Sequence, residues 1–63
     1  MTTVEQIARE IVEAEMADNW FLADLLWSRL RAVNRARRAL GLRPIRATQA
    51  WYFDEQRRDT RAA

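Results

Sequence analysis

The sequence predicts a small all-α protein with a helical hairpin, at about 3–17 and 19–40, and a shorter C-terminal helix at about 46–58. Apolar residues recur every three or four positions, which places them on one face of a helix. The single glycine and the single proline lie close together, at positions 41 and 44, so these two residues interrupt helical structure at one place only. The 63 residues form one domain, near the lower limit for a self-sufficient core. Residues from about 59 onward are expected to fray.

The first predicted helix begins after Thr2 and Thr3, because Glu5 and Gln6 follow them at the spacing of a capping box. Its apolar face is expected to contain Val4, Ile7, Ala8, Ile11 and Ala14. The pair Asp18-Asn19 can stop this helix and cap the next one. A single continuous helix is the alternative, but its heptad seam would place polar residues in the core. The sequence therefore favours a hairpin.

The second predicted helix contains the longest apolar pattern in the chain. Its inward stripe is expected to contain Leu22, Leu26, Leu30, Val33 and Leu40. Gly41 suits the left-handed position after the last turn, and Pro44 prevents the helix from resuming. Arg29 and Arg37 lie within the apolar half. The stem of Arg29 is expected to follow the edge of the core. For Arg37 two expectations stay open: a stem along the same edge, or contact between its guanidinium group and a carboxylate.

The third segment is predicted to complete the core. Ile11 is expected to oppose Leu26, and Ile7 to oppose Leu30, so the first helix ends before the second. The overhang at residues 36–40 then needs cover from the segment after residue 42. Thr48 can cap a third helix there. The triplet at 51–53 would also suit a strand, but a lone short strand has no partner in this chain.

Charge is distributed unevenly along the chain. Residues 1–28 contain six acidic residues and one arginine, whereas residues 29–63 contain ten arginines and three acidic residues. A chain with this polarity can pair with another copy or present its basic half to an acidic partner. All eleven basic residues are arginine, which is typical of GC-rich genomes. We therefore expect a high-GC bacterium or one of its phages as the source.

The composition argues against several classes of function. The chain has no histidine and no cysteine, and its one serine, Ser28, has no candidate base near it in the sequence. We therefore expect no catalysis, no metal site, no cofactor and no small-molecule substrate. No apolar run approaches membrane-spanning length, and the N-terminus lacks the order of a signal peptide. A cytoplasmic location is expected.

The aromatic residues predict a protein interface. Six aromatics in so short a chain point in more directions than one small core can accommodate. Aromatics and arginines are enriched at interfaces, although Trp20 and Trp27 could instead pack beneath the third helix. We expect a non-enzymatic protein-interaction module, either a homo-oligomer or a partner of another protein, such as a phage or bacterial regulatory or assembly protein. The predicted interface residues are Trp20, Trp27, Arg37, Leu40, Trp51, Tyr52 and Phe53.

A row of arginines predicts the alternative, a small DNA- or RNA-binding regulator. Arginine forks bind phosphate, and a row of them can follow a backbone. The residues of this row are Arg31, Arg35, Arg38, Arg43 and Arg46. Residues 39–45 also faintly resemble the turn of a helix-turn-helix, with the third helix as the reader. Pro44 and the acidic residues of the third helix argue against that motif, and an ordinary solvated basic face also explains the row.

Overall fold

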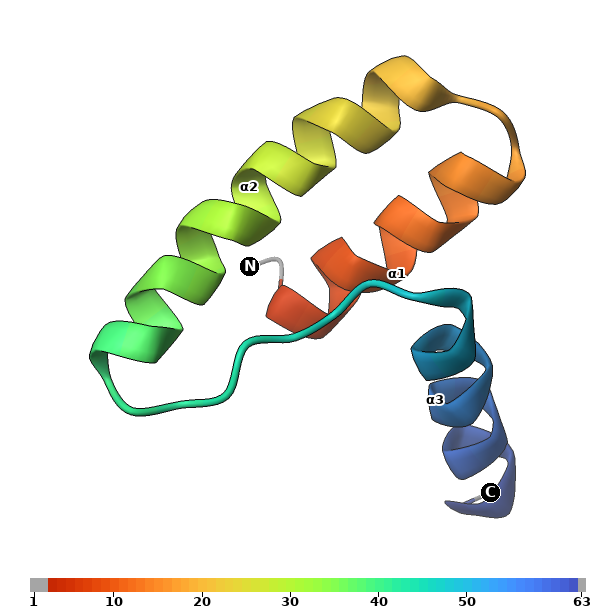
Figure 1. Ribbon diagram of the computed structural model, residues 1–63. Helices are drawn as coiled ribbons and strands as arrows, with labels where there is room; N and C mark the ends of the chain where they lie inside the picture. The colour runs from red at the N-terminus through yellow and green to blue at the C-terminus, as the bar shows by residue number, and fades with distance from the viewer. Residues whose placement is uncertain (1–2, 63) are drawn as a thin grey trace.

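The computed structural model describes the backbone of residues 3–62 and the side chains of residues 3–58. It contains the helices α1 (Val4–Met16), α2 (Trp20–Ala39) and α3 (Gln49–Ala62). Helices α1 and α2 lie side by side and antiparallel, and an extended linker returns from the end of α2 to begin α3 (Figure 1). The predicted all-α hairpin with a shorter C-terminal helix is confirmed. Within the described residues, none of the helices is both long enough and apolar enough to cross a membrane.

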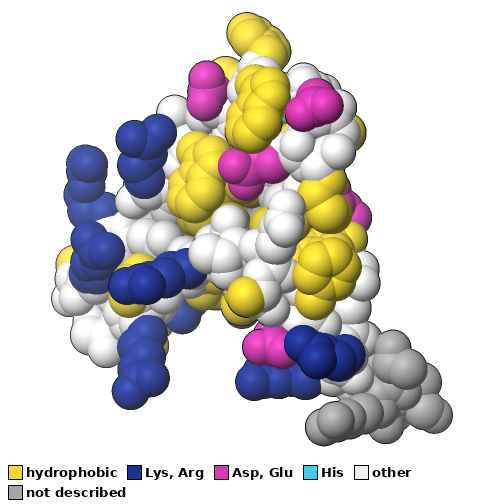
Figure 2. Space-filling model, turned by 45° about the vertical axis from the view of Figure 1, so that its right-hand side comes forward, with side chains coloured by type: hydrophobic (Ala, Val, Ile, Leu, Met, Phe, Trp, Pro, Cys, Tyr) yellow, Lys and Arg dark blue, Asp and Glu magenta, His cyan; other side chains and the backbone are white. Residues whose placement is uncertain are grey.

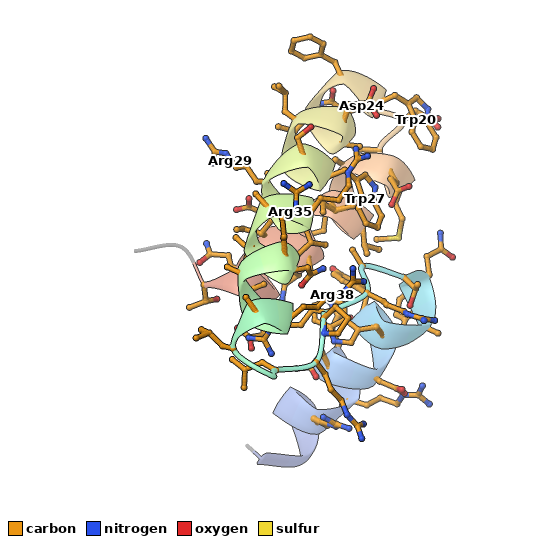
Figure 3. All side chains as sticks on the ribbon, turned by 60° about the vertical axis from the view of Figure 1, so that its left-hand side comes forward. Trp20, Asp24, Trp27, Arg29, Arg35 and Arg38 are labelled. Atoms are coloured by element: carbon orange, nitrogen blue, oxygen red, sulfur yellow. The ribbon has the colours of Figure 1, made fainter. Side chains whose placement is uncertain are left out.

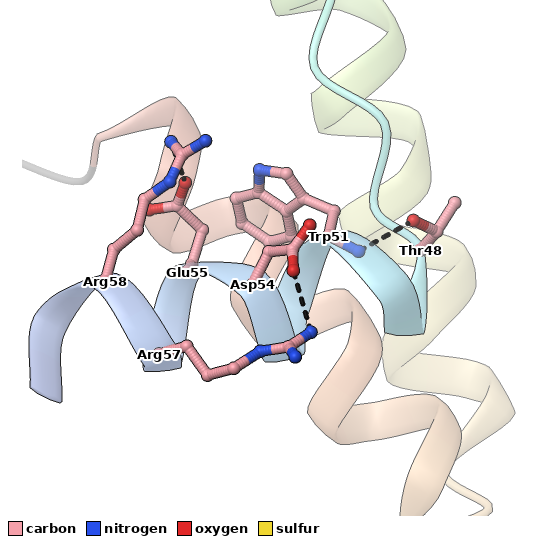
Figure 4. A network of polar contacts seen from close by, with 6 residues as sticks. All are labelled: Thr48, Trp51, Asp54, Glu55, Arg57 and Arg58. Carbon is pink, nitrogen blue, oxygen red and sulfur yellow. Dashed lines mark hydrogen bonds and ion pairs between the residues drawn. The ribbon is translucent and has the colours of Figure 1, made fainter. Parts of the chain in front are cut away.

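Each helix begins at a capping side chain that the sequence predicts. The hydroxyl of Thr3 accepts a hydrogen bond from the N–H of Gln6 at 3.1 Å. The side chain of Asn19 accepts from the N–H of Leu22 at 3.3 Å. The hydroxyl of Thr48 accepts from Trp51 at 3.2 Å, so α3 begins at Gln49 rather than at about 46 (Figure 4).

Helix α3 ends at Ala62, beyond the predicted end at about 58. Two ion pairs at i,i+3 spacing lie on its surface, Asp54–Arg57 at 2.8 Å and Glu55–Arg58 at 3.4 Å (Figure 4). Such exposed pairs contribute little to stability. The predicted fraying from about residue 59 stays a prediction, and Ala63 lies outside the described residues.

The C-termini of α1 and α2 close with the same backbone motif. Asp18 has φ 56° and the N–H of Asn19 donates to the carbonyl of Ala14 at 2.8 Å. Gly41 has φ 77° and the N–H of Leu42 donates to the carbonyl of Arg37 at 2.8 Å. Both are Schellman closures, in which a left-handed residue follows the last turn. The sequence predicts the glycine; Asp18 adopts the same conformation although a side chain makes it less favourable.

The core lies between α1 and α2, and the linker and the first turn of α3 complete it. Its buried members are Ile7, Ala8, Ile11, Val12, Leu26, Leu30, Ala47 and Tyr52. The residues expected to oppose one another, Ile11 with Leu26 and Ile7 with Leu30, all belong to this cluster. Val4, Trp27, Val33, Ile45 and Trp51 pack around it, partly buried.

The predicted inward stripe of α2 is wrong at both ends. Leu22 is 40% exposed and Leu40 is 77% exposed. Ala23 is buried instead, so the buried face of α2 is rotated away from Leu22. Leu40 lies past the last turn of a helix that is longer than α1, and the linker does not cover it. Helix α2 packs on α1, and the buried residues of its inward face are Ala23, Leu26 and Leu30.

Asn34 holds the linker against α2. Its Nδ2 donates to the carbonyl of Ile45 at 2.9 Å, and its Oδ1 accepts from the N–H of Ile45 at 3.0 Å. The Nε of Arg37 donates to the carbonyl of Arg43 at 2.9 Å. Within the described side chains, Arg37 therefore meets a backbone carbonyl of the linker rather than a carboxylate. These bonds direct Ile45 and Ala47 onto the core.

Replacing Asn34 with alanine is expected to lower the free energy of unfolding by about 1–3 kcal/mol, because a partly buried N–H and carbonyl of Ile45 lose their partners. A domain of this size seldom holds more than about 3–5 kcal/mol in total. Urea unfolding followed by circular dichroism measures the change. Arg35→Ala, at an exposed position of the same helix, is the control and should change stability by about 0.5 kcal/mol or less. Equal stability of the two variants would contradict this role of Asn34.

Candidate functional site

Large apolar side chains remain exposed where α1 turns into α2. We call this group the turn-end cluster; its members are Met16, Trp20, Phe21, Leu22 and Leu25. Phe21 is 79% exposed and Leu25 is 54% exposed, so the fold leaves most of both side chains in water. Exposed apolar groups that gather in one region mark interaction sites, whereas scattered ones do not.

The cluster is exposed because three bulky residues follow one another at the start of α2. Successive residues of a helix point about 100° apart, so Trp20, Phe21 and Leu22 cannot all face α1. Trp20 lies along the same side of α2 as Asp24 and Trp27, and Arg29 points to the opposite side (Figure 3). Leu22 borders a shallow depression of about 460 Å³ beside the turn. The other residues around that depression are Glu10, Glu13, Ala14, Ala17 and Asn19.

Phe21 and Leu25 continue into a stripe on the side of α2 opposite the core. Phe21, Leu25, Ser28 and Ala32 are all exposed and follow one another at spacings of four, three and four residues. We call these four residues the outer stripe. Its first half is bulky and apolar, and its second half is small. Helix α2 therefore has one apolar face in the core and a second one in solvent.

The structure distributes the predicted interface residues over several environments. Trp20, Leu40 and Phe53 are exposed, but they lie at the start of α2, just past its end and on α3. Trp27 and Trp51 pack against the core, as does the ring of Tyr52, which is 7% exposed. Arg37 is partly buried and bonded to the linker. These seven residues do not form one surface, and Tyr52 has no place in the surface proposed below.

Sequence reasoning missed Phe21, Leu25 and Met16 as exposed residues. The available signal was the position of Phe21 and Leu25 on the face opposite Leu26 and Leu30. Met16 gives no comparable signal, because its exposure depends on where α1 ends.

The predicted arginine row is exposed throughout. Arg31, Arg35, Arg38, Arg43 and Arg46 all lie in solvent. In the view of Figure 2 many basic side chains gather on the left, apart from most of the acidic ones, and others lie at the bottom beside an acidic side chain. Both ion pairs found among residues 3–58 lie within α3, so none of the five arginines is neutralised by a carboxylate there. Arg31 makes a long bond, 3.4 Å from its Nε to the carbonyl of Trp27.

The linker and α3 do not have the geometry of a helix-turn-helix. The linker covers residues 40–48, whereas the turn of such a motif has about three or four residues. The third helix is the expected reader of bases, but its residues Trp51 and Tyr52 pack on the core, and of the three residues at its start that could read them only Gln49 is exposed. If the arginine row binds nucleic acid, it does so from α2 and the linker.

A hydrogen bond of Tyr52 connects α3 to α1. The Tyr52 hydroxyl donates to Oε2 of Glu13 at 3.1 Å. Burial raises the pKa of Tyr52 above its ordinary value of 10.0, and the hydrogen bond to Glu13 and the charge of that carboxylate raise it further. Gln56 and Arg9 act in the opposite direction. The neutral phenol is thus the form that the folded protein favours.

Comparison with known proteins supplies no relative from which a function could be transferred. The chain matches no protein-family model, no curated protein and no solved structure. The exposed surfaces of the fold are therefore the basis for a functional proposal.

The contact between Tyr52 and Glu13 predicts a loss of stability at alkaline pH. Because the folded-state pKa is raised, the contribution of Tyr52 is fully present below pH 10.0 and is lost as the pH rises through the folded-state pKa. Tyr52 is the only tyrosine, and the chain has no lysine or cysteine to titrate in the same range. Absorbance of the tyrosinate ion therefore reports this one group, and urea midpoints measured across alkaline pH report stability.

The matched variant is Tyr52→Phe, which keeps the ring and removes the hydroxyl. It is expected to have a lower urea midpoint than wild type at neutral pH and to lack the wild-type decline that begins above pH 10.0. Parallel curves for the two proteins through alkaline pH would show that the phenol does not couple to folding.

Proposed function

We propose that this chain is a non-enzymatic protein-interaction module whose binding surface is the turn-end cluster with the outer stripe of α2. The observation that supports the proposal is the exposure of Phe21, at 79%, with Leu25 beside it on the same helical face. Fully burying a side chain of this type contributes about 1.5–3 kcal/mol. A protein that covers this surface would therefore gain apolar contacts that the fold leaves unused.

The surface lies on a rigid part of the hairpin. Asn19 caps the first turn of α2, and the Schellman closure at Asp18 sets how the chain enters that turn. Side chains held on such a helix lose less freedom on binding than side chains on a mobile loop. The position of the cluster thus favours recognition by a partner.

The second candidate function is binding of nucleic acid by the arginine row. The observation that favours it is the exposure of five arginines without a carboxylate partner among the described side chains. Guanidinium groups bind phosphate oxygens in bidentate fashion. This candidate ranks second because the same arginines also suit an acidic protein surface.

A photo-crosslinking amino acid at position 21 tests the first proposal. In the cells that produce the protein, irradiation is expected to yield a discrete adduct, either with a second copy or with a different protein. The control carries the same group at Gln6, an exposed position of α1. Adding Leu25→Asp should abolish the adduct, because it places a charge in the apolar contact. Equal labelling from positions 21 and 6 would contradict a binding surface at the turn.

Salt dependence separates the two candidates. A complex held by apolar contacts should persist at about 0.5 M salt, where the Debye length is only about 4 Å. Binding of a labelled duplex through the arginine row would instead weaken steeply with salt, and Arg31, Arg35 and Arg38 changed together to alanine would reduce that slope. Fluorescence anisotropy measures both. Tight, strongly salt-dependent duplex binding by the wild type would reverse the ranking.

A further inference from the structure

The outer stripe of α2 is complementary to itself when two copies run antiparallel. Consider a twofold axis that passes beside the peptide between residues 26 and 27. It places Phe21 of one copy against Ala32 of the other, and Leu25 against Ser28. Each bulky side chain then meets a small one, which allows two helices to pack closely. The spacing of four, three and four residues is the heptad pattern of such a pair.

The flanks of the stripe are complementary as well. Asp24 and Arg31 are seven residues apart on one flank of α2, and both are exposed. In an antiparallel pair, the flank of α2 that carries Asp24 and Arg31 faces the same flank of the other copy. Asp24 of each copy therefore lies beside Arg31 of the other. On the second flank, Leu22 meets the aliphatic stem of Arg29 from the other copy. The carboxylate of Asp24 has no hydrogen bond or ion pair within the described part of its own chain, and Arg31 has no carboxylate partner there.

We infer that the outer stripe of α2 binds a second copy of this chain, antiparallel, with two reciprocal ion pairs between Asp24 and Arg31. This inference rests on the proposed function and names its partner. The apolar contacts of Phe21 and Leu25 supply the affinity, and the ion pairs select the register and the antiparallel direction. A parallel pair would instead place Phe21 beside Phe21 and Ala32 beside Ala32, and Arg31 would have no acidic residue opposite it. The twofold contact closes on itself, so association ends at a dimer.

Charge reversal on purified full-length chain provides the test. Sedimentation equilibrium at low ionic strength should show a wild-type dimer. Asp24→Arg and Arg31→Asp should each weaken dimerisation about tenfold, because two weak attractions become two weak repulsions. Circular dichroism establishes that both variants remain helical. Arg46→Asp, an exposed linker position, carries the same change of charge and should dimerise like wild type.

Mixing the two weakened variants gives the decisive result. One copy then has arginine at both positions and the other has aspartate at both, so a heterodimer contains both ion pairs. The equimolar mixture should regain the wild-type association constant, although neither variant does so alone. A mixture no better than its components, or single variants that dimerise like wild type, would overturn the antiparallel register.

The remaining outcomes separate this inference from the proposed function. A wild-type dimer that is insensitive to both reversals shows association through another face and leaves an interaction module in place. A wild-type monomer at high micromolar concentration, with a crosslinked adduct to a different protein at position 21, overturns the second copy and retains the module. A monomer without any adduct at that position removes both.

Discussion

The two hydrogen bonds between Asn34 and the backbone of Ile45 are the contact on which the arrangement of this protein depends. A hairpin of two helices leaves one side of its core open, and only the linker and α3 can close it. One amide side chain satisfies the N–H and the carbonyl of the same residue, so the linker lies against α2 in an extended form. Ala47 and then Tyr52 reach the core because of this placement. The bond from Arg37 to the linker carbonyl strengthens the same attachment.

This arrangement determines which residues of α2 remain in solvent. The core takes Ala23, Leu26 and Leu30, and the linker occupies the neighbouring side of the helix near Asn34. No element of the described chain covers the side that carries Phe21 and Leu25. The core is small, and burial of these residues would require a further element. The interaction proposal rests on this apolar stripe, which stays in water although the helix that carries it is capped and ordered.

The sequence was sufficient for the helices, because their signals are local. Periodicity placed the first two, and Thr3, Asn19, Thr48 and Gly41 marked ends by short-range bonding or backbone preference. The rotation of α2 was not predictable in this way, since it depends on contacts between segments distant in the chain. Asn34 illustrates the limit: a lone polar residue in a helix gives no indication that it binds a backbone eleven positions later. The sequence indicated the candidate surface only as a surplus of aromatics; of the three tryptophans Trp20 is exposed, and Trp27 and Trp51 are partly buried.

Asn19 lies between the two helices of the hairpin and bonds to both, and this has a consequence for the order of folding. Its N–H completes the end of α1, and its side chain opens α2, so one short turn forms both closures at once. Contacts between residues near in sequence form quickly, because little chain entropy is lost in closing them. Tyr52 and Glu13 are separated by 39 positions, so more chain entropy is lost when they come into contact. Nucleation at the turn, followed by docking of the linker and α3, is therefore the folding route that this topology favours, with the apolar residues of the turn assembled before the core is closed.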